Sequence, residues 1–287
     1  MFEGLIINAD TEEQLLGYLR RSDPGSLILS GKKHMGKATA AKRVAEHLLG
    51  GRLFPNPDFM AVEPEDGTIH IEQVRCLIEK SRLLPAAAKR QVFLVDDADR
   101  MSISAQNALL KLLEDGNDTN IVIFISNGGL LPTICSRCTQ VSFLECDMDM
   151  QDGVLKLLSN GCPGISAMYK DTVFLAVIKE SVTCLNESPG DILKIMHAVK
   201  EKDKDFFFDK YTLEEVQLYF KFLREFYKAA LLQQLGYSQA GIPVDGVCLR
   251  DDMPRICELA NLAERQCRMK KYSRNDFLRF LFELALG

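Results

Sequence analysis

The sequence has 287 residues and a formal net charge of −5, with 47% hydrophobic and 26% charged residues. This composition excludes a disordered chain, and the acidic balance leaves only a local basic patch as a route to nucleic acid. The length is sufficient for more than one domain. No apolar run reaches the length of a membrane span, and the first residues lack the pattern of a secretory signal. The nine scattered cysteines therefore indicate the reduced thiols of a cytoplasmic protein.

Five short apolar runs in the first half of the chain alternate with helical patterns. The runs are typical of buried strands and lie at 27–29, 59–62, 92–95, 121–125 and 141–143. The helical patterns lie at 10–21 with Asp10 or Thr11 as cap, 41–49 before Gly50-Gly51, 71–84 before Pro85, and 103–113, with Ile103, Leu109, Leu110, Leu112 and Leu113 on its apolar side. Strands that alternate with helices predict an α/β fold with a five-stranded parallel sheet and right-handed crossovers.

After Cys146 the sequence contains helical patterns only. They cover 154–158, about 165–185, 192–199, 212–235, 252–269 and 273–286. The longest opens with a capping box, Thr212-x-x-Glu215, and carries aromatic and aliphatic residues at helical spacing. This stripe favours the core of a helical bundle over a base-stacking surface, and it consists of Val216, Tyr219, Phe220, Leu223, Phe226, Tyr227 and Ala230. The charged run at 201–205 is a candidate domain boundary, or else a solvated helix end.

A glycine-rich loop follows the first strand and precedes a helix. Its sequence is Gly31-x4-Gly36-Lys37, the context in which a P-loop binds phosphate with backbone N–H groups and with the helix N-terminus. Lys37 would then lie against the β- and γ-phosphates. The pattern fails at Ala38, where a serine or threonine would hold Mg²⁺, and Thr39 comes one residue too late. The alternative is a loop that binds no nucleotide.

Two acids, Asp96 and Asp97, follow the strand at 92–95, as they do in a Walker B motif. In an active ATPase the first acid holds Mg²⁺ and a following glutamate polarises the attacking water. The side chain of Asp97 is one methylene shorter than that glutamate, and catalysis is sensitive to such displacements. Together with Gly31, Gly36, Lys37, Ala38 and Thr39, these acids form a candidate nucleotide site that is degenerate.

A third motif, Ser136-Arg137-Cys138, precedes the last strand. The order of these motifs resembles that of the AAA+ clamp-loader ATPases, over roughly the first half of the chain. The segments that carry the resemblance are Asn56-Pro57-Asp58-Phe59, Ile71-Glu72-Gln73-Val74-Arg75, Val95-Asp96-Asp97-Ala98-Asp99-Arg100-Met101, Ala105-Gln106-Asn107-Ala108-Leu109-Leu110-Lys111-Leu112-Leu113-Glu114 and Leu131-Pro132-Thr133-Ile134-Cys135-Ser136-Arg137-Cys138.

The resemblance implies that Arg137 acts as an arginine finger in trans, at an interface that includes Ser136 and Cys138. In the family this arginine reaches the γ-phosphate of ATP bound to a neighbouring subunit, and in GTPases such a finger accelerates hydrolysis about 10³–10⁵-fold. The alternative is an arginine paired within its own domain, to a carboxylate such as Glu145. The family's lid often carries an arginine in a Gly-x-Pro-Gly-Arg stretch, and here that position is Ile165.

Three weakened ATPase features, at Ala38, Asp97 and Ile165, imply a subunit that does not hydrolyse ATP by itself. By resemblance we expect a non-catalytic clamp-loader subunit of the DNA polymerase III holoenzyme, acting as a rigid stator in a hetero-oligomeric ring with gamma/tau and delta subunits. The ring would load the sliding clamp on primer–template DNA. The expected domains are an AAA+ nucleotide-binding-like domain at 1–146, a helical lid at 147–205 and an all-α collar for oligomerisation at 206–287.

Two other functions remain open from the sequence. The first is an ATP-hydrolysing motor subunit, in which Lys37 and Asp96 act and Thr39 substitutes for Ala38 through a shifted loop. The second is a scaffold that binds no nucleotide and supplies no finger. ATP or ADP is thus a possible ligand of the degenerate site.

No metal is expected. Many relatives insert a four-cysteine zinc module after the P-loop helix, but the segment 50–58 is short and contains no cysteine. Cys135-x2-Cys138 has metal-like spacing without a nearby histidine, so two free thiols are the better interpretation.

Overall fold

The computed structural model describes residues 2–114, 119–146, 152–187 and 212–234. The chain divides into two compact units, the first of which contains the described residues up to Cys146 together with 162–164. The second unit contains the remaining described residues. The two units are described separately below.

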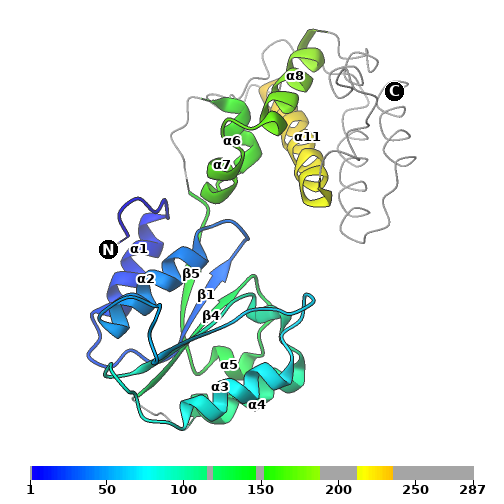
Figure 1. The fold of residues 1–287 in the computed structure, drawn as a ribbon. Helices are drawn as coiled ribbons and strands as arrows, with labels where there is room; N and C mark the ends of the chain where they lie inside the picture. Colours follow the sequence, from blue (N-terminus) through cyan, green and yellow to red (C-terminus); the bar gives the residue numbers. More distant parts are fainter. Residues whose placement is uncertain (1, 115–118, 147–151, 188–211, 235–287) are drawn as a thin grey trace. The chain divides into compact units, whose positions relative to one another are not determined.

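The first unit is a parallel sheet between two layers of helices (Figure 1). Its strands are β1 (Leu27–Gly31), β2 (Phe59–Val62), β3 (Gln91–Val95), β4 (Asn120–Ser126) and β5 (Thr139–Phe143), in the order β2-β3-β4-β1-β5. Its helices are α1 (Ala9–Leu19), α2 (Lys37–Leu49), α3 (Ile71–Ser81), α4 (Ile103–Glu114) and α5 (Pro132–Cys135), with a 3₁₀ turn, η1 (Ala98–Arg100), after β3. All pairs of neighbouring strands are parallel, so the predicted five-stranded α/β sheet is confirmed.

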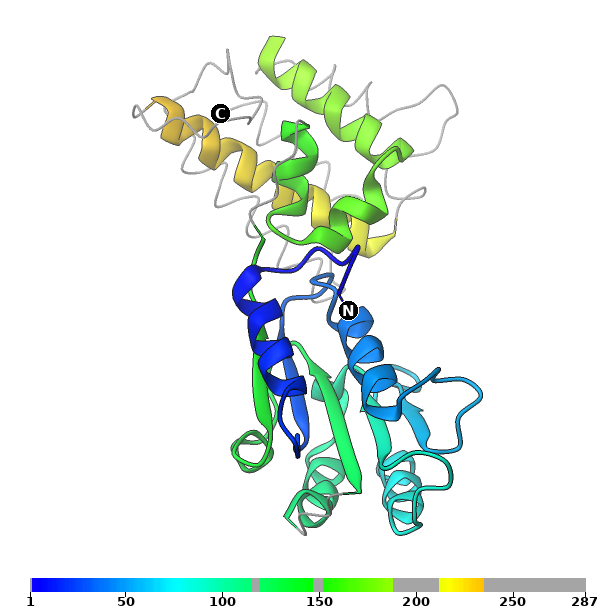
Figure 2. The same ribbon diagram turned by 90° about the vertical axis from the view of Figure 1, so that its left-hand side faces the viewer.

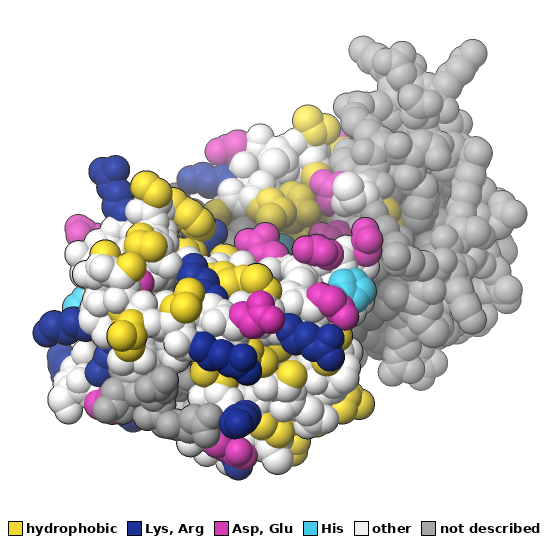
Figure 3. Space-filling model, turned by 60° about the horizontal axis from the view of Figure 1, so that its bottom comes forward, with side chains coloured by type: hydrophobic (Ala, Val, Ile, Leu, Met, Phe, Trp, Pro, Cys, Tyr) yellow, Lys and Arg dark blue, Asp and Glu magenta, His cyan; other side chains and the backbone are white. Residues whose placement is uncertain are grey.

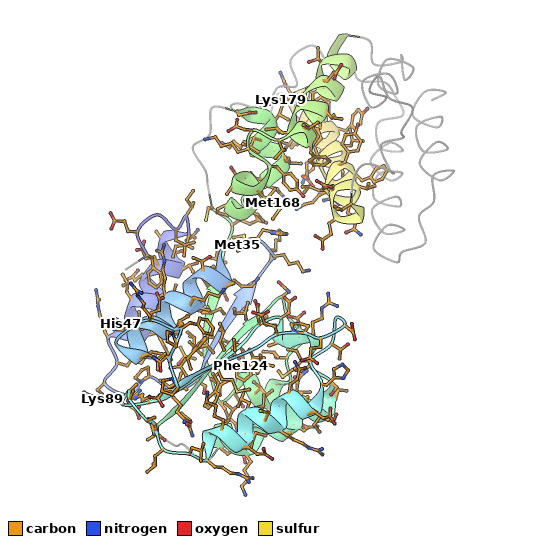
Figure 4. The ribbon with its side chains drawn as sticks, in the orientation of Figure 1. Met35, His47, Lys89, Phe124, Met168 and Lys179 are labelled. Carbon is orange, nitrogen blue, oxygen red and sulfur yellow. The ribbon has the colours of Figure 1, made fainter. Side chains whose placement is uncertain are left out.

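Both faces of this sheet are buried, which explains why its strands read as continuous apolar runs. On the face covered by α3, α4 and α5, Phe124 packs in the core, as its label in Figure 4 marks. This core contains Ile28, Phe93, Val95, Val122 and Phe124 from the strands and Val74, Leu77, Ala105, Leu109 and Ile134 from the helices. Because neighbouring strand residues point to opposite faces, Leu27 and Leu29 face the other helical layer.

The ends of several predicted helices differ from the structure. The cap of α1 is Asn8, whose Oδ1 accepts a hydrogen bond from the Asp10 N–H, and not Asp10 or Thr11. Thr11 is instead buried and donates its hydroxyl to the Ser142 carbonyl at 2.9 Å. Helix α3 ends at Ser81, before the predicted Leu84. A local apolar pattern cannot anticipate the role of Thr11, because its partner Ser142 lies 131 residues later in the chain.

The predicted apolar side of α4 is correct except at its first residue. Leu109 is fully buried, and Leu110, Leu112 and Leu113 pack against the core while partly buried. Ile103 is 69% exposed, because it lies at the start of the helix beyond the edge of the sheet core.

The second unit contains helices only among its described residues. They are α6 (Gly153–Ser159), α7 (Pro163–Tyr169), α8 (Val173–Glu187) and α11 (Leu213–Gln234). Helix α6 contacts both α8 and α11, and Figure 2 shows these helices as one group. The predicted single helix at 165–185 is two helices, because the Thr172 hydroxyl accepts the Leu175 N–H and starts a new helix after Asp171, whose φ is 63°.

Helix α11 begins as the capping box predicts. The Thr212 N–H donates to Glu215 Oε2 at 2.8 Å, and the Glu215 N–H donates to Thr212 Oγ1 at 3.3 Å. Every residue of the predicted stripe on this helix, from Val216 to Ala230, is buried. The helices predicted at 192–199, 252–269 and 273–286, and the charged run at 201–205, lie outside the described residues. The separation of a lid from a collar stays a prediction.

We expect Thr212→Ala to lower the free energy of unfolding of the helical unit by about 1 kcal/mol, because it removes an N-cap hydrogen bond. Urea unfolding followed by circular dichroism measures the change. Thr183→Ala is the matched control, since the Thr183 hydroxyl bonds only the Lys179 carbonyl within α8. Equal effects of the two substitutions would contradict the capping role.

Candidate functional site

The phosphate loop joins β1 to α2 and requires glycine at its first position. Gly31 has a φ of 144°, and a Cβ atom there would lie 2.6 Å from the Phe143 carbonyl oxygen of β5. Gly36 precedes α2 with a φ of 85°, and His34 has a φ of 62°. Such left-handed residues turn successive backbone N–H groups inward, which suits a phosphate at a helix N-terminus. The loop predicted from Gly31, Gly36 and Lys37 therefore has the backbone of an anion site.

The Lys37 side chain is buried and folded over this loop. Its Nζ donates to the carbonyl oxygens of Gly31 and Lys32, both at 2.5 Å, and to Asn127 Oδ1 at 3.0 Å. Burial lowers the pKa of the Lys37 ammonium, against the carboxylates of Asp97, Asp99 and Asp96, which act to raise it. Three acceptors use all three N–H donors, so a phosphate would bind Lys37 only by displacing these partners.

The strand order brings the acid pair close to this lysine. Only β4 lies between β3, which precedes the acids, and β1, which precedes the phosphate loop. The carboxyl ends of these strands meet at one edge of the sheet, which brings Asp96 and Asp97 to the phosphate loop. The Asp97 N–H donates to Asp96 Oδ1 at 2.8 Å, and Asp97 has a φ of 44°. Burial raises the pKa of Asp96 above its usual value, although the N–H of Asp97 acts to lower it.

Asn127 belongs to the same site, and the sequence analysis missed it. Its Oδ1 accepts from Lys37, its Nδ2 donates to Asp97 Oδ1 at 3.2 Å, and its backbone N–H donates to Asp99 Oδ1 at 2.9 Å. The sequence feature that could have identified Asn127 is the polar pair Ser126-Asn127 directly after the apolar run at 121–125. Asn127 therefore links the phosphate loop to the acids after β3.

These residues fit a phosphate better than they fit Mg²⁺. Gly36, Lys37 and the acid pair are among the residues that line a cavity of about 350 Å³. At the position where a P-loop hydroxyl would ligate Mg²⁺, Ala38 has only a methyl group, and Thr39 is exposed on the next position of the helix. The chain thus retains an anion cradle and two carboxylates but lacks the hydroxyl ligand of a P-loop metal site.

Arg137 lies near the amino ends of the strands, whereas the cavity lies at their carboxyl ends. It follows α5 and precedes Thr139, the first residue of β5, whereas Gly31 pairs with Phe143 at the other end of that strand. Four residues of extended strand separate the two ends by about 13 Å. Arg137 is therefore placed away from the phosphate loop of its own chain.

The Arg137 guanidinium contacts three groups of its own domain. Nη2 lies 2.6 Å from Glu114 Oε1, and Nη1 donates to the Thr133 carbonyl at 2.8 Å and to the Ser136 hydroxyl at 3.4 Å. The alternative of an arginine paired within its own domain is therefore what this chain by itself shows, with Glu114 as the carboxylate in place of Glu145, which pairs with Lys32. The Arg137 side chain is 33% exposed and Glu114 is 49% exposed. An ion pair this exposed contributes about 0–1 kcal/mol to stability.

The residues next to Arg137 have structural contacts. The Ser136 hydroxyl donates to the Thr133 carbonyl at 3.1 Å. Burial, with a smaller contribution from Cys135, raises the pKa of the Cys138 thiol to about 12. A metal-binding thiol is deprotonated, so this environment disfavours a metal at Cys135 and Cys138. In the part of the chain that the structure describes, no three His, Cys, Asp or Glu side chains are grouped for a metal ion.

The sequence profile of a family described as DNA polymerase III, delta subunit, matches residues 52–147. A DNA polymerase III subunit delta' from Pseudomonas aeruginosa is 38% identical over 89 residues, which is 30% of this chain and 27% of that protein. The chain resembles the delta' subunit of DNA polymerase III. The delta' subunit from Bacillus subtilis is 29% identical over 134 residues, covering 40% of this chain and 41% of its own length.

The resemblance extends to clamp-loader proteins of other domains of life. A replication factor C small subunit from Methanothermobacter thermautotrophicus is 29% identical over 134 residues, covering 46% of this chain and 41% of that protein. The chain thus spans less than half the length of each of these three relatives. Among solved structures, a DNA polymerase III, gamma subunit-related protein from Thermotoga maritima matches with a TM-score of 0.53 at 17% identity, covering 96% of this chain and 98% of the other. This structural likeness agrees with the predicted α/β fold.

Proposed function

We propose that this chain is a non-catalytic subunit of the DNA polymerase III clamp loader and that it supplies Arg137 to ATP bound by a neighbouring subunit. The observation that carries the proposal is the position of Arg137. It is exposed at the amino end of β5, whereas the phosphate loop of the same chain lies at the carboxyl end of β1. A guanidinium at that position can bind a phosphate on another molecule more readily than a phosphate held by its own domain.

The geometry of the degenerate site supports a chain that does not hydrolyse ATP by itself. Ala38 supplies no oxygen for Mg²⁺, and Asp97 is hydrogen-bonded to Asn127 in a left-handed conformation. The tight parallel sheet around these residues would then serve as a rigid stator surface. The proposed ring partners are gamma/tau and delta subunits, and the proposed substrates of the assembly are the sliding clamp and primer–template DNA.

The charge on the face seen in Figure 3 favours DNA contact through the assembly rather than through a basic track on that face. On the face seen in Figure 3, the described Lys and Arg side chains alternate with Asp and Glu side chains and with apolar groups. Mixed charges give little phosphate affinity, since that affinity grows with the number of phosphates neutralised. A cytoplasmic location follows from a role in replication; among the described residues, no helix has the length and apolarity to cross a membrane.

We expect the purified chain to show no ATP turnover above background, because the Mg²⁺ hydroxyl and the catalytic glutamate are both replaced. Turnover is measured with and without Mg²⁺, for wild type and for Lys37→Ala. Neither the metal nor the substitution should change the rate. Turnover that disappears in Lys37→Ala would instead identify a motor subunit.

A further inference from the structure

Glu114 is the last residue of α4, and its carboxylate lies against Arg137, 23 residues later in the chain. The C-terminal end of a helix carries partial negative charge, so a carboxylate there destabilises the helix. The position of Glu114 therefore needs a reason beyond helix stability. Among the described residues, its carboxylate forms an ion pair with Arg137.

Glu114, the Thr133 carbonyl and, at a longer distance, the Ser136 hydroxyl contact the guanidinium. Glu114 Oε1 binds Nη2 and the Thr133 oxygen binds Nη1, so the plane of the guanidinium is defined by contacts to α4 on one side and α5 on the other. An unrestrained arginine has many rotamers, whereas a planar group with a fixed fork loses less freedom for each further hydrogen bond.

We propose that Glu114 is a positioning residue that orients Arg137 toward the nucleotide of a neighbouring subunit. This inference rests on the function proposed above. Glu114 does not contact the nucleotide in this scheme; it raises the fraction of time in which the guanidinium has the productive orientation. An exposed pair of this kind shifts such a population by about fivefold at most, which sets the size of the expected effect.

The test uses the assembled clamp loader with clamp and primed DNA. We expect Glu114→Ala to slow hydrolysis about fivefold at the one nucleotide site that this chain faces, seen as a slower phase in single-turnover kinetics, with little change in the ATP concentration that gives half-saturation, because Arg137 acts in the transition state. Glu114→Gln keeps an acceptor oxygen and should recover part of the rate. Glu79→Ala is the matched control, since Glu79 is an exposed glutamate on α3. Thermal unfolding of each variant verifies that the fold is intact.

A double-mutant cycle separates positioning from a general structural effect. On the Arg137→Ala background, Glu114→Ala should cause no further loss, because its effect passes through the guanidinium. An unchanged or increased rate in Glu114→Ala, or an equal loss on both backgrounds, would overturn the proposal while leaving Arg137 as a finger. If Arg137→Ala itself has no effect on turnover, the proposed function fails, and the role of Glu114 fails with it.

Discussion

Arg137→Ala is expected to slow ATP hydrolysis about 10³-fold at the nucleotide site that this chain faces, since arginine fingers in trans have effects of that order or larger. The loss concerns one site of the assembly, so it appears in single-turnover kinetics as a slow phase. The physical reason is the loss of a planar cation that stabilises charge on the transferring phosphoryl group. Size-exclusion chromatography verifies that the complex still assembles.

Arg137→Lys is the sharpest control for this prediction. Lysine keeps the charge but presents a single ammonium instead of a fork, so it cannot bind Glu114, the Thr133 carbonyl and a phosphate in the same geometry. We expect a rate much closer to that of Arg137→Ala than to wild type. Full activity of Arg137→Lys would mean that charge alone suffices. Full activity of Arg137→Ala would leave the scaffold hypothesis as the better one.

Asp58→Asn is expected to lower the free energy of unfolding of the α/β unit by about 2–4 kcal/mol, because hydrogen bonds to a buried charge are among the strong ones. The Asp58 carboxylate is 1% exposed. It accepts the backbone N–H groups of Ala86, Ala87 and Ala88 at 2.6, 2.7 and 2.6 Å. An asparagine presents an NH₂ group toward these donors and loses the charge. Urea unfolding of the α/β unit measures the effect.

The pH dependence of this effect follows from the pKa of Asp58. Burial acts to raise that pKa, but the three N–H groups and the nearby Lys80 outweigh burial and hold it below its usual value. A carboxyl with a lowered folded-state pKa stabilises the fold above its unfolded pKa of about 3.9 and loses this effect as pH falls through the folded value. The difference between wild type and Asp58→Asn should therefore be constant near neutral pH and shrink below about pH 4.

The matched control for this prediction is Asp66→Asn. Asp66 is an exposed turn residue with a φ of 49°, a conformation that asparagine also adopts readily. We expect its stability to stay within about 0.5 kcal/mol of wild type. A loss for Asp66→Asn equal to that for Asp58→Asn would indicate a general effect of removing negative charge.

Local sequence patterns were sufficient to predict the strands of the sheet and the phosphate loop. Apolar runs predicted five strands, because a strand buried on both faces consists almost entirely of apolar residues. Each of the five strands was found in the sheet. The glycines at Gly31 and Gly36 predicted a loop whose backbone N–H groups bind phosphate, and both residues have positive φ angles in the structure. The substitution at Ala38 was equally visible, because a methyl group cannot ligate a metal in any fold.

The tertiary structure determined which of these residues contact one another. The strand order places β4 between β3 and β1, and this order brings Asn127 between Lys37 and Asp97. It also places Arg137 at the edge opposite the phosphate loop and beside Glu114 rather than Glu145. The same is true of Asp58, which the sequence analysis named only within the segment Asn56-Pro57-Asp58-Phe59 that carries the family resemblance.

The physical reason for this division lies in the range of the interactions. Hydrophobic periodicity and glycine conformation depend on a few neighbouring residues, so the sequence alone determined the strands, the loop and its missing hydroxyl. Ion pairs and buried hydrogen bonds such as Glu114–Arg137 and Asp58 with residues 86–88 join segments about 20–30 residues apart. Those contacts exist only after the helices pack on the sheet, and so only the tertiary structure determined them.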